Sequence, residues 1–114
     1  LLIYHAMDAY SDPDRYKLGA MLLDLDNPQK ILARSREPIL EPNEHYENNG
    51  WKAGVSYSCG AVEKDGQLLI YYGGADTVSC VAQMNLNEFV DNLIETEKPK
   101  IKVCAQNKQD HPVK

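Results

Sequence analysis

The segment Gly73-Gly74-Ala75-Asp76-Thr77 places a carboxylate after three small residues. Small residues let the backbone approach a ligand closely, and a carboxylate held there can accept two hydroxyl protons from a sugar. Asp76 is therefore a candidate ligand-binding residue. The alternative is an aspartate in a turn that connects two strands.

His5 is the second candidate, because it follows the apolar run Leu1–Tyr4 and is matched by Tyr72 in an internal repeat. Two polar rings at equivalent strand ends suggest that both could face one cavity. The alternative is a half-buried histidine whose hydrogen bonds are satisfied within the fold.

Trp51 and Tyr57 flank Gly54 ahead of a predicted hairpin. Aromatic rings near a polar cleft suit carbohydrates, whose C–H faces pack on the rings. The same two rings could equally fill the gap between two sheets.

Metal chemistry is not supported by the remaining polar clusters. The run Glu44–Glu47 lacks the histidine pair of a zinc protease helix, and Asp24–Pro28 lacks the glycine and distal glutamate of a calcium loop, so it is interpreted as a turn. A further cluster is interpreted as a solvated loop between strands: Asp8, Asp12, Asp14 and Arg15.

Composition excludes two classes of protein. The 114 residues carry a net charge of −5, the wrong sign for a phosphate-backbone binder. Apolar runs are also far shorter than the roughly 20 residues of a membrane-spanning helix. Three cysteines cannot all pair within one chain and lack zinc spacing. Reduced thiols, and hence a cytoplasmic location, are expected.

Elements that must position these residues follow from periodicity and turn chemistry. Leu1–His5 and Leu68–Tyr72 are similar at an offset of 67 residues. Asp65-Gly66 predicts a type I′ turn between strands at 59–64 and 67–72. A third strand is predicted to begin at Val78, and a short strand is predicted at 30–35. Residues 41–54 are predicted to form an ordered loop. A helix is predicted at 86–95, capped by Asn85 or Asn87, and a polar tail at 96–114.

These motifs, in this order, resemble the C-terminal third of glycoside hydrolase family 130, the β-mannoside phosphorylases and their relatives. The resemblance covers roughly residues 1–93 and rests on Tyr4-His5, Tyr16–Ala20, Leu22–Pro28, Arg34–Pro42, Tyr46-Glu47, Cys59–Val62 and Ile70–Thr77. It implies an all-β fold, a five-bladed β-propeller. Residues 1–95 would supply its C-terminal blades, about two, together with a short C-terminal helix.

The resemblance further implies phosphorolysis of β-mannosides, commonly β-1,4-linked, with inversion to give α-mannose 1-phosphate. Inorganic phosphate would be the co-substrate, with no cofactor and no metal. Tyr4 and His5 match the family's Tyr-His strand end near the phosphate pocket, followed here by Ala6 instead of the usual glycine. Asp76 matches the aspartate that binds the mannosyl unit. The family's general acid lies in its N-terminal part, outside these residues.

Two alternatives remain open: a mannoside hydrolase of the same fold, and a non-catalytic carbohydrate-binding or assembly propeller. The expected partners are a mannose-containing oligosaccharide, phosphate and the remainder of the propeller, with homo-oligomers possible through the helix and tail. The chain alone is expected to be inactive.

Overall fold

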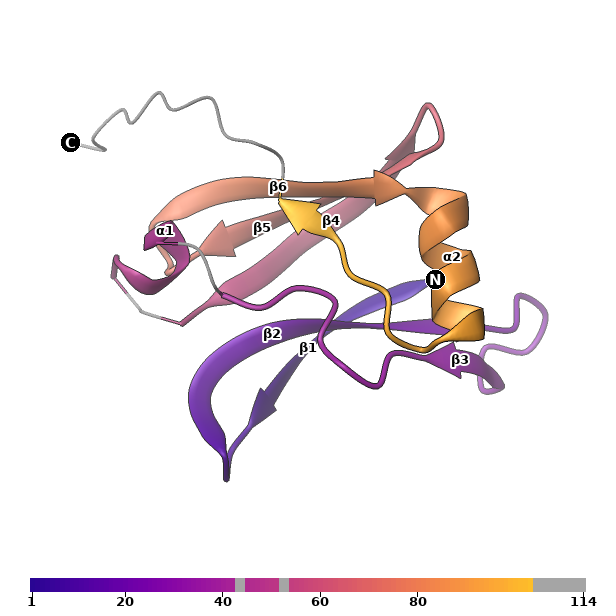
Figure 1. The fold of residues 1–114 in the computed structure, drawn as a ribbon, viewed down its shortest axis with the longest axis horizontal. Helices are drawn as coiled ribbons and strands as arrows, with labels where there is room; N and C mark the ends of the chain where they lie inside the picture. The colour runs from indigo at the N-terminus through magenta and orange to yellow at the C-terminus, as the bar shows by residue number, and fades with distance from the viewer. Residues whose placement is uncertain (43–44, 52–53, 104–114) are drawn as a thin grey trace.

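The computed structural model describes residues 1–42, 45–51 and 54–103. They form two antiparallel sheets and two helices, drawn in Figure 1. The first sheet contains β1 (Leu2–Asp8), β2 (Asp12–Leu23) and β3 (Ile31–Arg34) in that order. The second contains β4 (Ser56–Lys64), β5 (Gln67–Gly74), β6 (Val78–Asn85) and β7 (Lys102–Val103). Helix α1 spans His45–Asn48, and helix α2 spans Leu86–Glu95.

The β4–β5 hairpin confirms the prediction from Asp65-Gly66. Asp65 and Gly66 have φ of 51° and 78°, as a type I′ turn requires, and Lys64 pairs with Gln67 on either side of them. β6 continues the meander by pairing with β5 along its whole length. The predicted short strand at 30–35 is β3, and the predicted all-β architecture is confirmed, while the number of blades stays a prediction.

Helix α2 has the predicted bounds and cap. The side chain of Asn85 accepts a hydrogen bond from the backbone N–H of Glu88, which satisfies one of the free donors of the first turn. Phe89 and Leu93 lie on the buried face of the helix. α2 contacts β2, β3 and β6, so it joins the two sheets at one end of the strands, opposite α1 (Figure 1).

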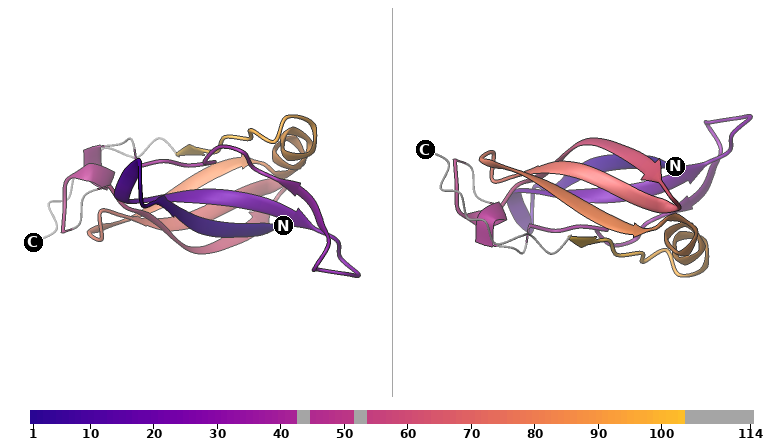
Figure 2. Two further views of the ribbon diagram at one scale, coloured as in Figure 1. Left: turned by 90° about the horizontal axis from the view of Figure 1, so that it is seen from below. Right: turned by 90° about the horizontal axis from the view of Figure 1, so that it is seen from above.

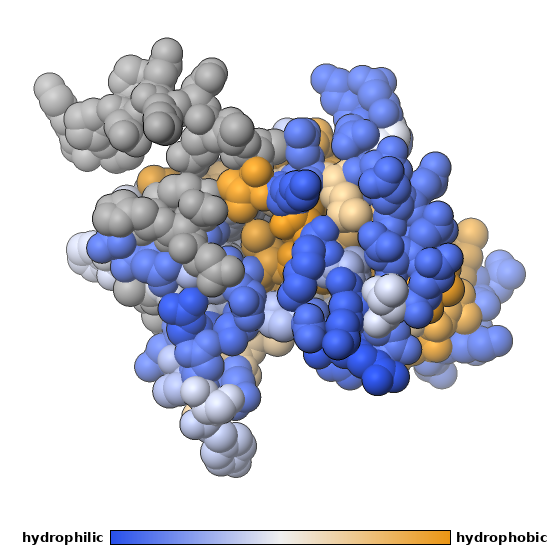
Figure 3. Space-filling model, in the orientation of Figure 1, coloured by the Kyte–Doolittle hydropathy of each residue, from blue (hydrophilic) through white to orange (hydrophobic). Residues whose placement is uncertain are grey.

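One hydrophobic core lies between the sheets. Its buried residues come from both sheets, from α2 and from the connecting segments: Leu18, Ala20, Ala33, Ile39, Leu40, Leu68, Ile70, Tyr72, Cys80, Ala82, Phe89, Leu93 and Ile101. Seen from below and from above, the two sheets are twisted and lie one against the other in a thin molecule (Figure 2). Most of the face in Figure 3 is hydrophilic, with hydrophobic residues near its centre and at its right edge.

Residues 97–103, part of the predicted polar tail, lie across both sheets. The backbone of Arg36 donates to the carbonyl of Glu97, the backbone of Ile101 donates to the carbonyl of Ile39, and β7 then pairs with β6. The segment therefore links the connection after β3 to the edge of the second sheet. Residues 104–114 of the predicted tail lie outside the described residues.

The prediction of a loop at Asp8, Asp12, Asp14 and Arg15 was wrong, although Asp8 and Asp14 are exposed to solvent as predicted. β1 extends to Asp8 and β2 begins at Asp12, so only residues 9–11 connect them. The carboxylate of Asp8 accepts hydrogen bonds from the backbone N–H groups of Tyr10 and Ser11 and from the Ser11 hydroxyl, which closes a tight turn. Two basic residues of β2 form salt bridges with Asp12. The distances to Asp12 Oδ2 are 3.3 Å from Arg15 Nε and 2.6 Å from Lys17 Nζ.

Candidate functional site

Residues from both sheets meet at a cavity of about 360 Å³. It is lined by Tyr16 from β2, by Val55 and Tyr57 at the start of β4, and by Asp76 from the turn between β5 and β6. The two sheets are joined here by backbone bonding, since the N–H of Tyr16 donates to the carbonyl of Gly54 at 2.9 Å. The cavity walls thus combine two tyrosines, one valine and one aspartate.

His5 reaches this cavity through Tyr57. The two rings are stacked, with centroids 3.9 Å apart and an angle of 13° between their planes. Nε2 of His5 accepts a hydrogen bond of 2.8 Å from the backbone N–H of Ser58. An imidazole whose Nε2 accepts carries its proton on Nδ1 when neutral. His5 therefore presents an N–H donor at Nδ1, in a tautomer fixed by Ser58.

Asp76 lies in a backbone conformation that carries strain. Ala75 and Asp76 have φ of 50° and 53°, in the left-handed region that residues other than glycine rarely occupy. Each such residue costs on the order of 1–3 kcal/mol, and strain of this kind concentrates at functional sites. Asp76 is exposed, while Ala75 is fully buried and donates its N–H to the carbonyl of Val55. The turn is therefore held by its neighbour Ala75, which leaves the Asp76 carboxylate open to solvent.

Tyr4 is not brought together with His5 and Asp76. Successive side chains of a strand point to opposite faces, and Tyr4 lies opposite Gly19 while His5 lies opposite Leu18. The Tyr4 hydroxyl accepts a hydrogen bond of 3.3 Å from Nε of Arg34. It lines a separate cavity of about 620 Å³ whose other polar walls include Lys17 and Arg36.

The expectation that His5 and Tyr72 face one cavity was wrong for Tyr72. The repeat does align β1 with β5, but Tyr72 is only 1% exposed and belongs to the hydrophobic core. Tyr72 lies in β5, which has β4 and β6 on its two sides. His5 lies in β1, which is an edge strand of the first sheet. Equivalent positions in the two sheets thus have different surroundings.

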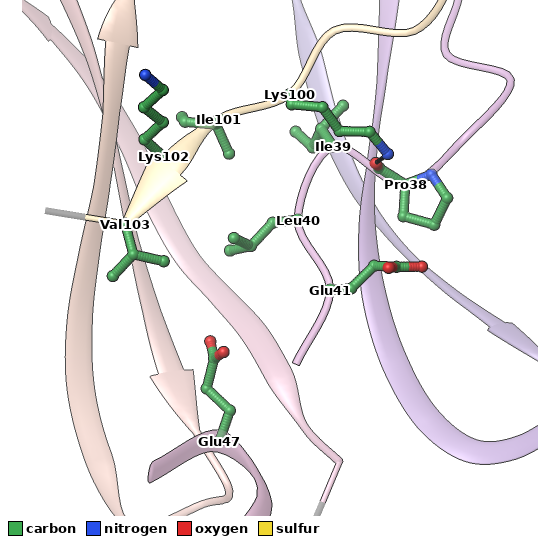
Figure 4. Close-up of a pocket in the computed structure, with 9 residues that line it drawn as sticks. All are labelled: Pro38, Ile39, Leu40, Glu41, Glu47, Lys100, Ile101, Lys102 and Val103. Atoms are coloured by element: carbon green, nitrogen blue, oxygen red, sulfur yellow. Dashed lines mark hydrogen bonds between the residues drawn. The ribbon is translucent and has the colours of Figure 1, made fainter. Parts of the chain in front are cut away.

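A third cavity, of about 480 Å³, surrounds Glu47 of α1 and is shown in Figure 4. The Glu47 carboxylate points toward Leu40 and Val103. The Lys100 side chain points away from Glu47 and donates a hydrogen bond of 2.7 Å to the carbonyl of Pro38. Glu47 is fully buried, accepts from the Ser56 hydroxyl at 3.1 Å, and accepts the N–H of Gly54 at its carbonyl. These bonds hold the segment before β4 in place, so we assign Glu47 to the support of the candidate site.

Within the part of the chain that the structure describes, no group of three or more histidine, cysteine, aspartate or glutamate side chains could hold a metal ion. The same residues contain no helix that is long and apolar enough to cross a membrane. Cys80 is a free, buried thiol, and its burial raises its pKa to about 11. It lies in the core and takes no part in the candidate site.

Tyr16 and Ser58 belong to the candidate site, and the sequence did not single them out. Ser58 acts through its backbone, and Tyr16 is placed by a bridge between β2 and Val55 that joins residues far apart in the chain. Contacts of this kind leave no periodic pattern in the sequence. Tyr16 does lie within one of the motifs that carry the family resemblance. Tyr57 was identified as one of two aromatic candidates, and the structure places it at the cavity.

Comparison with known proteins identifies the family to which this two-sheet chain belongs. A model described as beta-1,4-mannooligosaccharide phosphorylase matches residues 1–95, and the chain belongs to this family, glycoside hydrolase family 130. The resemblance noted from the sequence is thereby confirmed.

Named relatives come from several bacteria. A 1,2-beta-oligomannan phosphorylase of Thermoanaerobacter sp. is 49% identical over 76% of this chain and 28% of its own length. A beta-1,4-mannooligosaccharide phosphorylase of Ruminococcus albus is 34% identical over 80% of this chain and 28% of its own length. The structure of a beta-1,2-mannobiose phosphorylase from Listeria innocua, in complex with beta-1,2-mannobiose, matches with a TM-score of 0.71 and 40% identity over 80% of this chain and 25% of that one. The chain thus spans about a quarter of the length of the relatives it matches.

Proposed function

We propose that this chain forms part of an inverting glycoside phosphorylase that cleaves β-mannosides with inorganic phosphate to give α-mannose 1-phosphate. The observation that carries the proposal is that Asp76 and Tyr57 line one cavity, while the ring of His5 stacks on Tyr57. The names of four relatives, each a mannoside phosphorylase, support the same reaction.

Asp76 is assigned to the mannosyl unit. Its carboxylate is exposed at the cavity wall and can accept hydrogen bonds from two sugar hydroxyls. Charge-assisted hydrogen bonds of this kind are about twice as strong as neutral ones. The left-handed backbone at Ala75 and Asp76 fixes the carboxylate before the sugar arrives.

His5 is assigned to phosphate. Because Nε2 is occupied by the Ser58 N–H, the donor that His5 can offer is the N–H at Nδ1. Phosphate is the nucleophile of the reaction, already anionic, so it needs donors that orient it and no general base. Tyr4 remains a predicted binding residue, but its ring lies on the other face of β1, beside Arg34.

The proton donor for the leaving sugar is proposed to come from a part of the protein outside this chain.

We propose that the outward faces of the two sheets contact the remainder of the propeller. Val62 and Tyr71 lie on the face of the second sheet that points away from the core, and are 47% and 48% exposed. Apolar side chains on such a face are suited to contact with a neighbouring sheet.

The linkage is the finer part of the proposal. The sequence resemblance suggested β-1,4, but the relatives with 49%, 51% and 40% identity are named for β-1,2-linked mannosides, and the one named for β-1,4 is 34% identical. These names favour β-1,2.

The test is a phosphate-dependent assay on the full-length protein that carries this chain. β-1,2-Mannobiose and β-1,4-mannobiose are incubated with and without phosphate, and mannose 1-phosphate is followed by phosphorus NMR. We expect product only with phosphate, and faster with the β-1,2 substrate. Release of free mannose without phosphate would indicate the hydrolase alternative, and sugar binding without turnover would indicate the binding-module alternative.

A further inference from the structure

Trp51 is the chain's only tryptophan, and it is 90% exposed. A large aromatic side chain contributes most when it is buried, as the core residue Phe89 is. Trp51 therefore makes little contribution to the packing of the described chain. An exposed indole at a defined position is a feature of binding surfaces, because one end is apolar and the other can donate a hydrogen bond.

The position of Trp51 is defined by the turn that carries Asp76. The backbone N–H of Trp51 donates to the hydroxyl of Thr77 at 2.7 Å, and that hydroxyl donates to the carbonyl of Ala75 at 2.9 Å. The Thr77 hydroxyl thus accepts one hydrogen bond and donates another. Through it the backbone of Trp51 is linked to Ala75 and Thr77, the residues immediately before and after Asp76.

Gly50 permits this close approach. A Cβ built at Gly50 would lie 2.3 Å from the Thr77 hydroxyl and 3.0 Å from the carbonyl of Ala75. A side chain at this position would push the segment away from the turn. The absence of a side chain lets the backbone of Gly50 and Trp51 lie directly against Ala75 and Thr77, the two residues that flank Asp76 in the turn.

We propose that Trp51 is the aromatic platform for the second sugar ring of the mannoside, the ring that leaves when the bond is cleaved. The inference rests on the proposed function, in which Asp76 holds the mannosyl unit. The C–H face of a pyranose packs on an aromatic ring, and Trp51 offers an exposed indole on the segment that is hydrogen-bonded to the turn of Asp76. Trp51 would then act on affinity for the leaving sugar, with no part in the bond cleavage.

The experiment measures the reverse reaction of the full-length protein, in which mannose 1-phosphate and an acceptor mannose bind separately. In Trp51→Ala we expect the KM for the acceptor to rise roughly 10-fold, the loss expected for one aromatic contact. The KM for mannose 1-phosphate should stay within twofold of that of the unchanged protein. Trp51→Phe keeps a ring and should recover most of the affinity.

Tyr10→Ala is the matched control, because Tyr10 is a fully exposed aromatic residue at the tip of the β1–β2 hairpin. It should leave both KM values unchanged. If Trp51→Ala matches the Tyr10→Ala control, or raises the two KM values equally, the platform is excluded.

Binding measured without turnover separates this inference from the proposed function. The protein is labelled with 5-fluorotryptophan, and the fluorine resonance of Trp51 is assigned as the one that Trp51→Phe removes. Mannobiose without phosphate should shift it. A shift in a protein that forms no mannose 1-phosphate supports the platform and overturns the phosphorylase. An unmoved resonance in an active phosphorylase overturns the platform alone.

Discussion

Nε2 of His5 in β1 accepts a hydrogen bond of 2.8 Å from the backbone N–H of Ser58 in β4, joining the two sheets beside the candidate cavity. The bond fixes the tautomer of the ring, and the stacked Tyr57 fixes its plane. His5 therefore couples the packing of the two sheets to the position of Tyr57, which lines the candidate cavity.

His5→Phe separates these two roles. Phenylalanine can keep the stacking on Tyr57 but has no acceptor for the Ser58 N–H and no donor for phosphate. Leaving a partly buried N–H unsatisfied should lower the free energy of unfolding by about 1–3 kcal/mol. In steady-state kinetics of the full-length protein, the KM for phosphate should rise about 10-fold or more, while the KM for mannobiose changes little. An unchanged KM for phosphate would show that His5 has a structural role only.

Much of the local structure could be predicted from the sequence, because its causes are local. The left-handed preference of Asp65-Gly66 and the 3.6-residue period of helix α2 each act within a few residues, and both elements formed with the predicted bounds or close to them. The turn at Asp24 is likewise local, since its carboxylate accepts from the N–H groups of Asp26 and Asn27.

What the sequence missed depends on contacts between distant residues. His5 and Ser58 are 53 positions apart, and only the packing of the two sheets brings them together. The different surroundings of His5 and Tyr72 arise in the same way, from an extra strand, β4, beside Tyr72. The small residues before Asp76 made it a candidate, and that role stays a prediction. Its position in one cavity wall with Tyr16 and Tyr57 could not be predicted from the sequence.

Gly19→Ala tests the packing of Tyr4 across the first sheet. A Cβ at Gly19 would lie 2.4 Å from the Tyr4 ring, so the ring must leave its place beside Arg34. We expect the free energy of unfolding to fall by about 1–3 kcal/mol, as for other overpacked sites. The control is Gly60→Ala in β4, where a Cβ would meet nothing within 4 Å and where φ is not positive. Urea denaturation of both variants measures the difference, and equal midpoints would contradict the close packing of Tyr4 on Gly19.

Phe89→Ala tests the helix that joins the sheets. Phe89 is fully buried in the shared core, and removing a buried phenylalanine side chain costs about 3–5 kcal/mol. Ile94 lies on the same helix but is 54% exposed, so Ile94→Ala should cost much less. Thermal and urea denaturation, monitored by circular dichroism, compare the two. A loss for Ile94→Ala as large as that for Phe89→Ala would show that the helix docks through a different face.

Acid should open the turn between β1 and β2 only well below pH 4. The Ser11 hydroxyl, followed by the backbone N–H groups of Ser11 and Tyr10, lowers the pKa of Asp8 from 3.8 to about 2. Because the folded pKa is depressed, the stabilisation is complete above pH 3.8 and is lost as the pH falls toward 2. Amide NMR shifts of Tyr10 and Ser11 should therefore titrate near pH 2, and Asp8→Asn should remove that titration. A midpoint near 4 would contradict the hydrogen-bonded turn.

Asp76→Asn tests the proposed sugar contact at nearly constant shape, because asparagine tolerates the left-handed backbone that Asp76 adopts at φ 53°. Loss of a charged hydrogen bond costs about 1.5–3 kcal/mol, so kcat/KM for mannobiose should fall about 10- to 150-fold. Asp65→Asn is matched in chemistry and backbone, with φ 51°, but lies in the β4–β5 turn away from the cavity. It should leave kcat/KM unchanged. Equal kinetics in the two variants would remove Asp76 from the site, whereas a loss confined to Asp76→Asn, with normal unfolding, supports its contact with the mannosyl unit.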